Sequence, residues 1–361
     1  MMKKCFLFFI LISAICFSQQ KNLKVNDLQP KSENFNFPVV SFASKPLVER
    51  KINTFLQVNE LEFIPGSGSN PSQLALNSTN SYKNFLYFYE WKKLETPKNI
   101  LSLSIDGEAT GAYPEGFSDW KNFDLRTGNY INLKDLFETI SIDLIQNIVN
   151  ENIVNKIQNF LAELKSHIDP EDDEKEQIRM YEECLEYAKR GKLEHTKFFF
   201  GKDKLTIVRE RCSNHAMLAL DDLGSYEIEL PYKDIQQYLS LYGKNLLSKS
   251  DKFVRQNTVQ NKLYKGQIDQ KYPITLLMKQ VYEDGSFSAF YWYDKSKKLI
   301  EWSGILKDNH ISITENDYHS EELKKWIPKA YIEADVKGNK IVGTWQDYKI
   351  KKYLKLELQE L

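Results

Sequence analysis

The sequence lacks an excess of charge of either sign. Its 361 residues carry 49 Lys and Arg against 50 Asp and Glu, so the formal net charge is −1. Nucleic-acid-binding proteins usually carry an excess of positive charge, so the composition gives no support for a nucleic-acid partner. A hydrophobic content of 42% and a charged content of 27% are globular values. The length leaves room for two or three domains.

The sequence also lacks the short motifs that mark common active sites. It contains no His-Glu-x-x-His pair, no Walker loop and no Gly-x-Ser-x-Gly elbow, and its five His are scattered. Adjacent acids such as Asp221 and Asp222 are expected by chance among 50 acids, so they do not by themselves indicate glycoside hydrolysis. We therefore predict no catalytic residue, no metal site and no cofactor.

Long apolar runs are scarce as well, and the one at the N-terminus reads as a leader. Lys3 and Lys4 precede an apolar run over residues 5–16, and Ser18 supplies a small residue at the cleavage position. We predict a signal peptide over residues 1–18, which is too short for a stable membrane span. The chain is then exported to the periplasm or outside the cell, with no transmembrane segment after cleavage. Lipidation at Cys16 is the less favoured alternative.

Cysteine is rare, with four in the chain and two of them in the leader. In an oxidising compartment the remaining pair, Cys184 and Cys212, suggests one disulfide. The alternative is two separate buried thiols, because Cys184 shares a helical face with Tyr181 and Ala188. No Cys-x-x-Cys spacing is present, so redox catalysis is not indicated.

What the sequence does contain is one unusual segment over residues 101–137. Apolar and polar residues alternate over 101–106, which predicts a strand. Gly107, Gly111 and Gly116 follow within ten positions. Two interpretations stay open: a glycine-lined loop that holds a ligand, or a long hairpin crossing with ordinary glycines.

Five short motifs punctuate this segment, namely Ser102 with Ser104, residues 110–114, residues 122–124, Thr127 with Gly128, and residues 133–137. They resemble the exported domain found outside the membrane in the anti-sigma factor RsiV and in front of the deacetylase domain of PdaC. The likeness covers roughly residues 36–247. It implies an α+β fold, and a lysozyme-like protein as one candidate partner, since the equivalent RsiV domain is a lysozyme receptor. That family often has His where this chain has Tyr113, so an imidazole-dependent function is not implied.

The order of the predicted elements divides the mature chain into four parts. Residues 19–34 are polar and predicted to be disordered. Residues 35–248 are predicted to form an α+β domain, with helices on one face of an antiparallel sheet and with 216–220 as one of its strands. Residues 249–262 read as a polar linker. The part over 263–361 has its own organisation.

Residues 263–361 contain about eight short strand signals separated by turns, which predicts a meander that closes into a small barrel. Residues 338–345 loosely resemble the final strands of calycin-like or lipocalin-like barrels. A helical insertion is predicted over 316–329. We expect the domain and the barrel to have separate cores.

The binding residues predicted from these patterns are Asp106, Glu108, Tyr113, Trp120, Phe290 and Trp292. The first four belong to the glycine-rich segment. Phe290 and Trp292 share one face of a strand whose other face is also aromatic. They either form an exposed platform for a ligand or pack between domains.

The sequence predicts an exported, non-catalytic binding protein of the cell envelope, with peptidoglycan, another glycan or a lysozyme-like protein as its ligand. The alternative is an envelope hydrolase that uses carboxylates near the Gly107–Gly116 loop. A lipocalin-like ligand pocket in the barrel is a third interpretation, which a solidly packed interior would dismiss.

Overall fold

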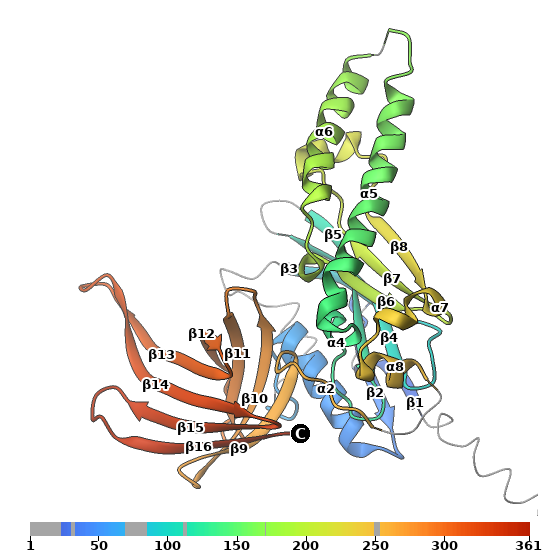
Figure 1. Cartoon of the computed structure of the whole chain (residues 1–361). Coiled ribbons are helices and arrows are strands. Elements are labelled where there is room, and N and C mark those ends of the chain that lie inside the picture. The colour runs from blue at the N-terminus through green and yellow to red at the C-terminus, as the bar shows by residue number, and fades with distance from the viewer. Residues whose placement is uncertain (1–22, 30–32, 69–84, 111–113, 170, 249–252) are drawn as a thin grey trace, which may run out of the picture.

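The computed structural model describes residues 23–29, 33–68, 85–110, 114–169, 171–248 and 253–361. It has an α+β body followed by a closed β-barrel, which lies to one side of the body (Figure 1). The predicted fold class is therefore confirmed. The predicted leader over residues 1–18 lies outside the described residues. Among the described residues, no helix has the length and apolar character needed to cross a bilayer.

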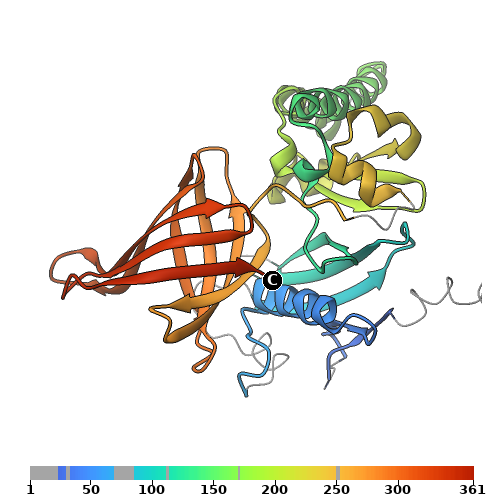
Figure 2. The same ribbon diagram turned by 60° about the horizontal axis from the view of Figure 1, so that its bottom comes forward.

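The first half of the body is a three-stranded antiparallel sheet with one helix. The sheet has the order β3-β4-β5, from β3 (Phe85–Lys93), β4 (Ile100–Thr110) and β5 (Pro114–Asp124). Helix α2 (Pro46–Leu61) starts with proline in its first turn, where the missing N–H costs nothing. Its buried face shares one hydrophobic core with β4, and Figure 2 shows the helix beside the sheet.

A two-stranded ribbon completes this half. Strand β1 (Leu23–Asp27) pairs antiparallel with β2 (Pro38–Phe42). The prediction of disorder over 19–34 is therefore wrong for the residues of β1. Val25 stands opposite Val40 in the ribbon and packs against the same core. The pairing with β2 and the contact with the core give this segment an ordered structure, although its polar composition suggests disorder.

The second half of the body is a helical hairpin on a second three-stranded sheet. Helices α5 (Ile142–Leu164) and α6 (Asp172–Lys189) pack on each other and share a core with the antiparallel sheet β6-β7-β8. The remaining elements are β6 (Lys197–Phe200), β7 (Lys204–Arg209), β8 (Tyr226–Pro231), α4 (Leu133–Leu136), α7 (Tyr232–Ile235), α8 (Leu241–Leu247) and the short 3-10 helices η1 (Thr139–Ser141), η2 (Leu193–His195), η3 (His215–Leu220) and η4 (Gln236–Tyr238). The predicted strand over 216–220 is thus wrong, because those residues form η3.

Eight antiparallel strands close the barrel in sequence order, with the last strand paired to the first. They are β9 (Lys262–Ile268), β10 (Tyr272–Val281), β11 (Ser286–Tyr293), β12 (Ile300–Lys307), β13 (His310–Ser320), β14 (Lys325–Lys337), β15 (Lys340–Asp347) and β16 (Tyr353–Glu360). The helix predicted over 316–329 is absent. Those residues extend the β13–β14 hairpin, in which Tyr318 pairs with Ile327 and His319 with Trp326.

The barrel is joined to the body through a shared core. Its interior forms one hydrophobic cluster, but Leu277, Phe290 and Trp292 point outward and pack into the core that contains α2 and β4. Asn129 of the body also donates a 2.9 Å hydrogen bond to the Glu360 carboxylate. The expectation of separate cores therefore holds for the barrel interior but not for the junction: among the described residues there are three clusters, and one of them contains residues of both parts.

Candidate functional site

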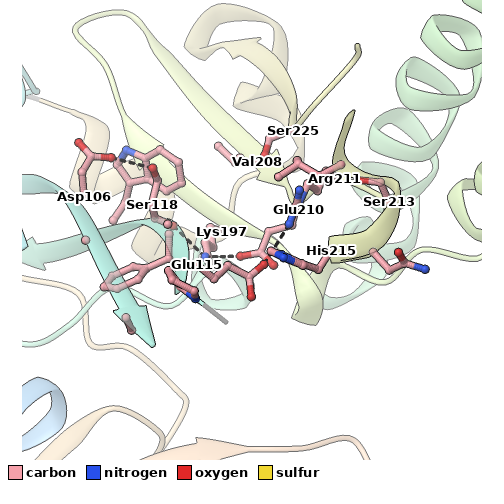
Figure 3. A pocket seen from close by; sticks show the side chains of 18 residues that line it. Asp106, Glu115, Ser118, Lys197, Val208, Glu210, Arg211, Ser213, His215 and Ser225 are labelled. Atoms are coloured by element: carbon pink, nitrogen blue, oxygen red, sulfur yellow. Dashed lines mark hydrogen bonds and ion pairs between the residues drawn. The ribbon is translucent and has the colours of Figure 1, made fainter. Parts of the chain in front are cut away.

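An open groove of about 1080 Å³ lies on the body between the β4–β5 hairpin and the segment that runs from β7 into η3 (Figure 3). It brings together residues 106–109 and 114–120 with residues of the range 197–225, which are far apart in the sequence. The predicted alternative of a long hairpin fits two of the three glycines: Gly107 and Gly116 lie within strands β4 and β5, where Gly107 pairs with Phe117 and Gly116 with Glu108. Gly111 lies outside the described residues.

Gly107 is needed for packing inside the hairpin. A Cβ atom at this position would lie 2.3 Å from the ring of Phe117, its cross-strand partner. Glycine thus lets an aromatic ring cover the strand, as in other pairs of a glycine with an aromatic residue across a sheet. The glycine therefore leaves room for the ring of Phe117, which is one of the groove's lining residues.

The hairpin supplies one wall of the groove. Asp106 accepts a 2.6 Å hydrogen bond from the Ser118 hydroxyl, directly across the strand pair. Trp120 stacks on Phe199 of β6, with ring centroids 5.2 Å apart and an interplanar angle of 24°. Trp120 is half-buried, so part of its ring remains open to a ligand in the groove.

Ion pairs connect the hairpin to the opposite wall. Arg211 contacts Glu115 at 3.0 Å. Lys197 donates a 2.8 Å hydrogen bond to the carbonyl oxygen of Ser118 and forms an ion pair with Glu210. Figure 3 shows these two pairs side by side. Exposed pairs of this kind are worth about 0–1 kcal/mol each, so a ligand can exchange them for its own contacts at little cost.

The opposite wall is tied to helix α6. Cys184 of α6 and Cys212 form a disulfide with Cα atoms 5.6 Å apart. The hydroxyl of Tyr181, also on α6, donates a 2.7 Å hydrogen bond to Asp221 and accepts one of 2.9 Å from the backbone N–H of Leu223. Burial is the main reason that the pKa of Tyr181 is raised, so the hydroxyl stays protonated as a donor. The wall is thus fixed at two points.

The structure brings only part of the predicted binding set to this groove. Asp106 and Trp120 line it, whereas Glu108 is not among the lining residues and Tyr113 lies outside the described residues. Phe290 and Trp292 are each 4% exposed. They pack against the body, so their prediction as an exposed platform is wrong and the alternative of interdomain packing describes them.

Sequence reasoning missed the second wall, which includes Lys197, Glu210, Arg211 and His215. A usable signal was present, because the charged run over 209–211 adjoins Cys212, the partner of a helix cysteine. Whether this charged run lies in a groove depends on which strands are neighbours in space, and the sequence does not show which strands are neighbours.

The arrangement can bind a polar ligand through several side chains at once. Lys and Arg donate, Asp and Glu accept, and Trp120 offers a flat apolar surface. Each of the carboxylates of Asp106, Glu115 and Glu210 already has a hydrogen-bond or ion-pair partner. Within the described residues, no group of three or more His, Cys, Asp or Glu is placed to hold a metal ion.

A scan against protein-family models finds no match, and a search of curated proteins finds none either. Among solved structures, the chain is similar to a DUF3298 family member from Bacteroides fragilis, at 18% identity and a TM-score of 0.34, over 60% of this chain and 90% of that chain. It is also similar to a DUF3298 family protein from Pseudomonas aeruginosa PAO1, at 12% identity and a TM-score of 0.38, over 63% of this chain and 96% of that chain.

Proposed function

We propose that this chain is an exported, non-catalytic binding protein of the cell envelope, and that the groove between the β4–β5 hairpin and η3 takes a glycan such as a peptidoglycan strand. The observation that carries the proposal is the open groove itself, with Trp120 on one wall and paired charges that bridge to the other. Sugar rings offer both an apolar face and many hydroxyls, which matches this mixture.

The resemblance of residues 36–247 to the RsiV-like and PdaC-like domains also supports an envelope ligand. In that family a lysozyme-like protein is a further candidate, and Arg211, Lys197 and Glu210 would then form polar contacts at a protein interface. The family motifs themselves lie mostly inside the fold. Ser102 and Asn122 are fully buried and Asp124 is 1% exposed, so these residues support the fold and are not available to a ligand.

Binding is tested with soluble peptidoglycan fragments and with lysozyme, each titrated calorimetrically into the mature chain. Trp120→Ala and Arg211→Glu should each weaken binding of the true ligand about tenfold, roughly 1.4 kcal/mol. Matched controls are Trp326→Ala on the barrel and Arg179→Glu on α6, both exposed and away from the groove. Equal binding by the groove variants and their controls would contradict the proposal.

The same preparation separates binding from hydrolysis. The alternative function is an envelope hydrolase that uses Asp106 or Glu108, and it requires turnover of cell-wall substrate that is abolished by Asp106→Asn or Glu108→Gln. Ligand recovered intact after long incubation supports binding alone. Export is tested by N-terminal sequencing of the protein recovered outside the cytoplasm, where cleavage after residue 18 leaves Gln19 first.

A further inference from the structure

The barrel is packed at one end and open at the other. Around Leu276, Phe287 and Ile332 the space left between side chains is only about 10 Å³, room for one water molecule at most. At the end where β9 turns into β10 and β15 into β16, the interior widens into a cup of about 750 Å³. That volume falls within the roughly 300–1,000 Å³ typical of small-molecule sites.

A buried carboxylate, Glu315, supports one of the side chains that line the cup. Glu315 is 1% exposed, and its Oε2 accepts hydrogen bonds from the Tyr291 hydroxyl at 2.8 Å, from Trp302 Nε1 at 3.1 Å and from Trp345 Nε1 at 3.3 Å. Its Oε1 lies 2.6 Å from the ammonium group of Lys329. These partners hold Trp345 in a fixed orientation, and Trp345 is itself a lining residue of the cup.

The walls of the cup are mostly apolar. They include Ile268, Tyr272, Pro273, Tyr293, Ile350 and Leu354. Two of these side chains are exposed to solvent: Tyr272 is 49% exposed and Ile350 is 72% exposed. An apolar hollow that stays open to water favours an apolar occupant, because its burial removes this surface from water.

The rim of the cup is positive. Lys271, Lys295 and Lys352 lie on three of the four turns at this end of the barrel and line the opening. Lys271 also forms an ion pair with Asp269 at 3.6 Å. One acid, Asp347, is among the described lining residues. It accepts hydrogen bonds from the backbone N–H groups of Lys349 and Ile350 at 2.8 and 2.9 Å, so its carboxylate stabilises the turn between β15 and β16. Apolar walls below a ring of lysines complement a molecule with an apolar chain and an anionic head.

We propose that the open end of the barrel binds the hydrocarbon chain of an anionic amphiphile, with the head group at Lys271, Lys295 and Lys352 and the chain between Tyr272, Ile350 and Leu354. This site is separate from the groove on the body and does not depend on the function proposed there. A free fatty acid and an anionic membrane lipid share this chemistry, and the experiment below distinguishes them.

The probes are octanoate, decanoate and dodecanoate, each kept below its micelle concentration and titrated calorimetrically into the mature chain. Burial of about 0.8 kcal/mol per methylene predicts that each added pair of methylenes tightens binding by up to about tenfold. Dodecyltrimethylammonium has a similar chain and the opposite charge. It should bind at least tenfold more weakly than dodecanoate.

The variants act on the two parts of the site separately. Ile350→Asp places a charge in an exposed part of the wall, where folding tolerates it, and should weaken dodecanoate at least tenfold. The pair Lys295→Glu and Lys352→Glu should weaken dodecanoate and strengthen the cationic probe. The matched control is Lys307→Glu with Lys340→Glu, which reverses two exposed lysines at the packed end of the barrel.

Two vesicle arms identify the source of the amphiphile. Cosedimentation with phosphatidylglycerol vesicles but not with phosphatidylcholine vesicles, lost in Ile350→Asp, assigns the site to membrane lipid. Binding of free dodecanoate without cosedimentation assigns it to a diffusible fatty acid. The proposal is overturned if neither probe binds, if chain length has no effect, or if the rim variants and the control pair bind dodecanoate equally.

Discussion

Asn122 of strand β5 donates a 2.7 Å hydrogen bond from its side-chain amide to the backbone carbonyl oxygen of Phe198 in β6. The other end of the same side chain accepts a 2.6 Å hydrogen bond from the Ser102 hydroxyl. The two three-stranded sheets of the body therefore meet through one fully buried side chain. Strand β5 carries one wall of the groove, and the sheet of β6 and β7 leads into the other, so Asn122 links the elements on which the two walls are built.

Asn122→Ala should lower the free energy of unfolding by about 1–3 kcal/mol, because it leaves the Phe198 carbonyl and the Ser102 hydroxyl buried without this partner. Urea denaturation followed by circular dichroism measures the loss. Asn152→Ala on the exposed face of α5 is the matched control and should change stability by less than about 0.5 kcal/mol. Equal losses in the two variants would mean that the bond between the sheets contributes nothing specific.

Removal of the disulfide should destabilise the body and loosen the groove. Cys184 and Cys212 are 28 residues apart, and closure of a loop of that length stabilises a protein by about 3.5 kcal/mol. A variant with Ser at both positions should show this loss in chemical denaturation, together with weaker binding of the groove ligand. Reductant should reproduce both effects in the native chain and have no effect on the variant. Unchanged ligand affinity would show that the tie to α6 is dispensable for the groove.

Lys51 predicts an unusual pH dependence of stability. Burial, followed by the repulsion of nearby Lys262, lowers the pKa of this 3% exposed side chain from 10.5 to about 8, even though Glu360 acts in the opposite direction. Between these two values the unfolded chain holds a proton that the folded chain has released, so the Lys51 contribution to stability rises with pH. Relative to Lys51→Met, the native protein should gain about 2–3 kcal/mol between pH 7 and pH 10.

The comparison with Lys51→Met matters because buried tyrosines act in the opposite sense near pH 10. Burial raises the pKa of Tyr226 to about 12, so the unfolded chain releases that proton first and stability falls as pH rises. The tyrosines are common to both proteins and cancel in the difference. A pH-independent difference between the two proteins would show that Lys51 keeps an ordinary pKa.

Removal of an aromatic side chain at the junction should weaken the packing of the barrel against the body. Trp292 is 4% exposed and lies in the core shared by both parts, so Trp292→Ala should cost about 3–5 kcal/mol. Because the barrel interior is a separate cluster, the barrel should remain folded and unfold in its own calorimetric transition. Trp326→Ala, at a residue that is 58% exposed, should leave the melting profile unchanged. A single transition at lower temperature in Trp292→Ala would instead indicate that the two parts fold as one unit.

Much of the architecture is encoded locally and could be predicted. Alternation in strands and evenly spaced turns are properties of short windows, and the closed barrel follows from eight such windows in a row. The helix predicted over 316–329 was wrong because Glu321, Glu322 and Lys324 favour helices intrinsically. Pairing across the β13–β14 hairpin overrides that preference.

The groove could be predicted only on one side. Asp106 and Trp120 were found because they lie in the segment with the distinctive motifs. Arg211 reaches Glu115 across 96 positions of sequence, and this proximity is set by the packing of β5 on β6. Likewise, alternation identified the two faces of β11, but it did not show that Trp292 would be covered by the body.

The pairing of β16 with β9 has a consequence for synthesis of the chain. The barrel wall stays open until residues 353–360 have emerged, and until then β9 and β15 each present an unpaired edge. Unpaired edges recruit strands from other chains, so the growing polypeptide is exposed to aggregation at the barrel until β16 has emerged. That strand also carries Glu360, which bonds to Asn129, so closure of the barrel and its attachment to the body are completed by the same few residues.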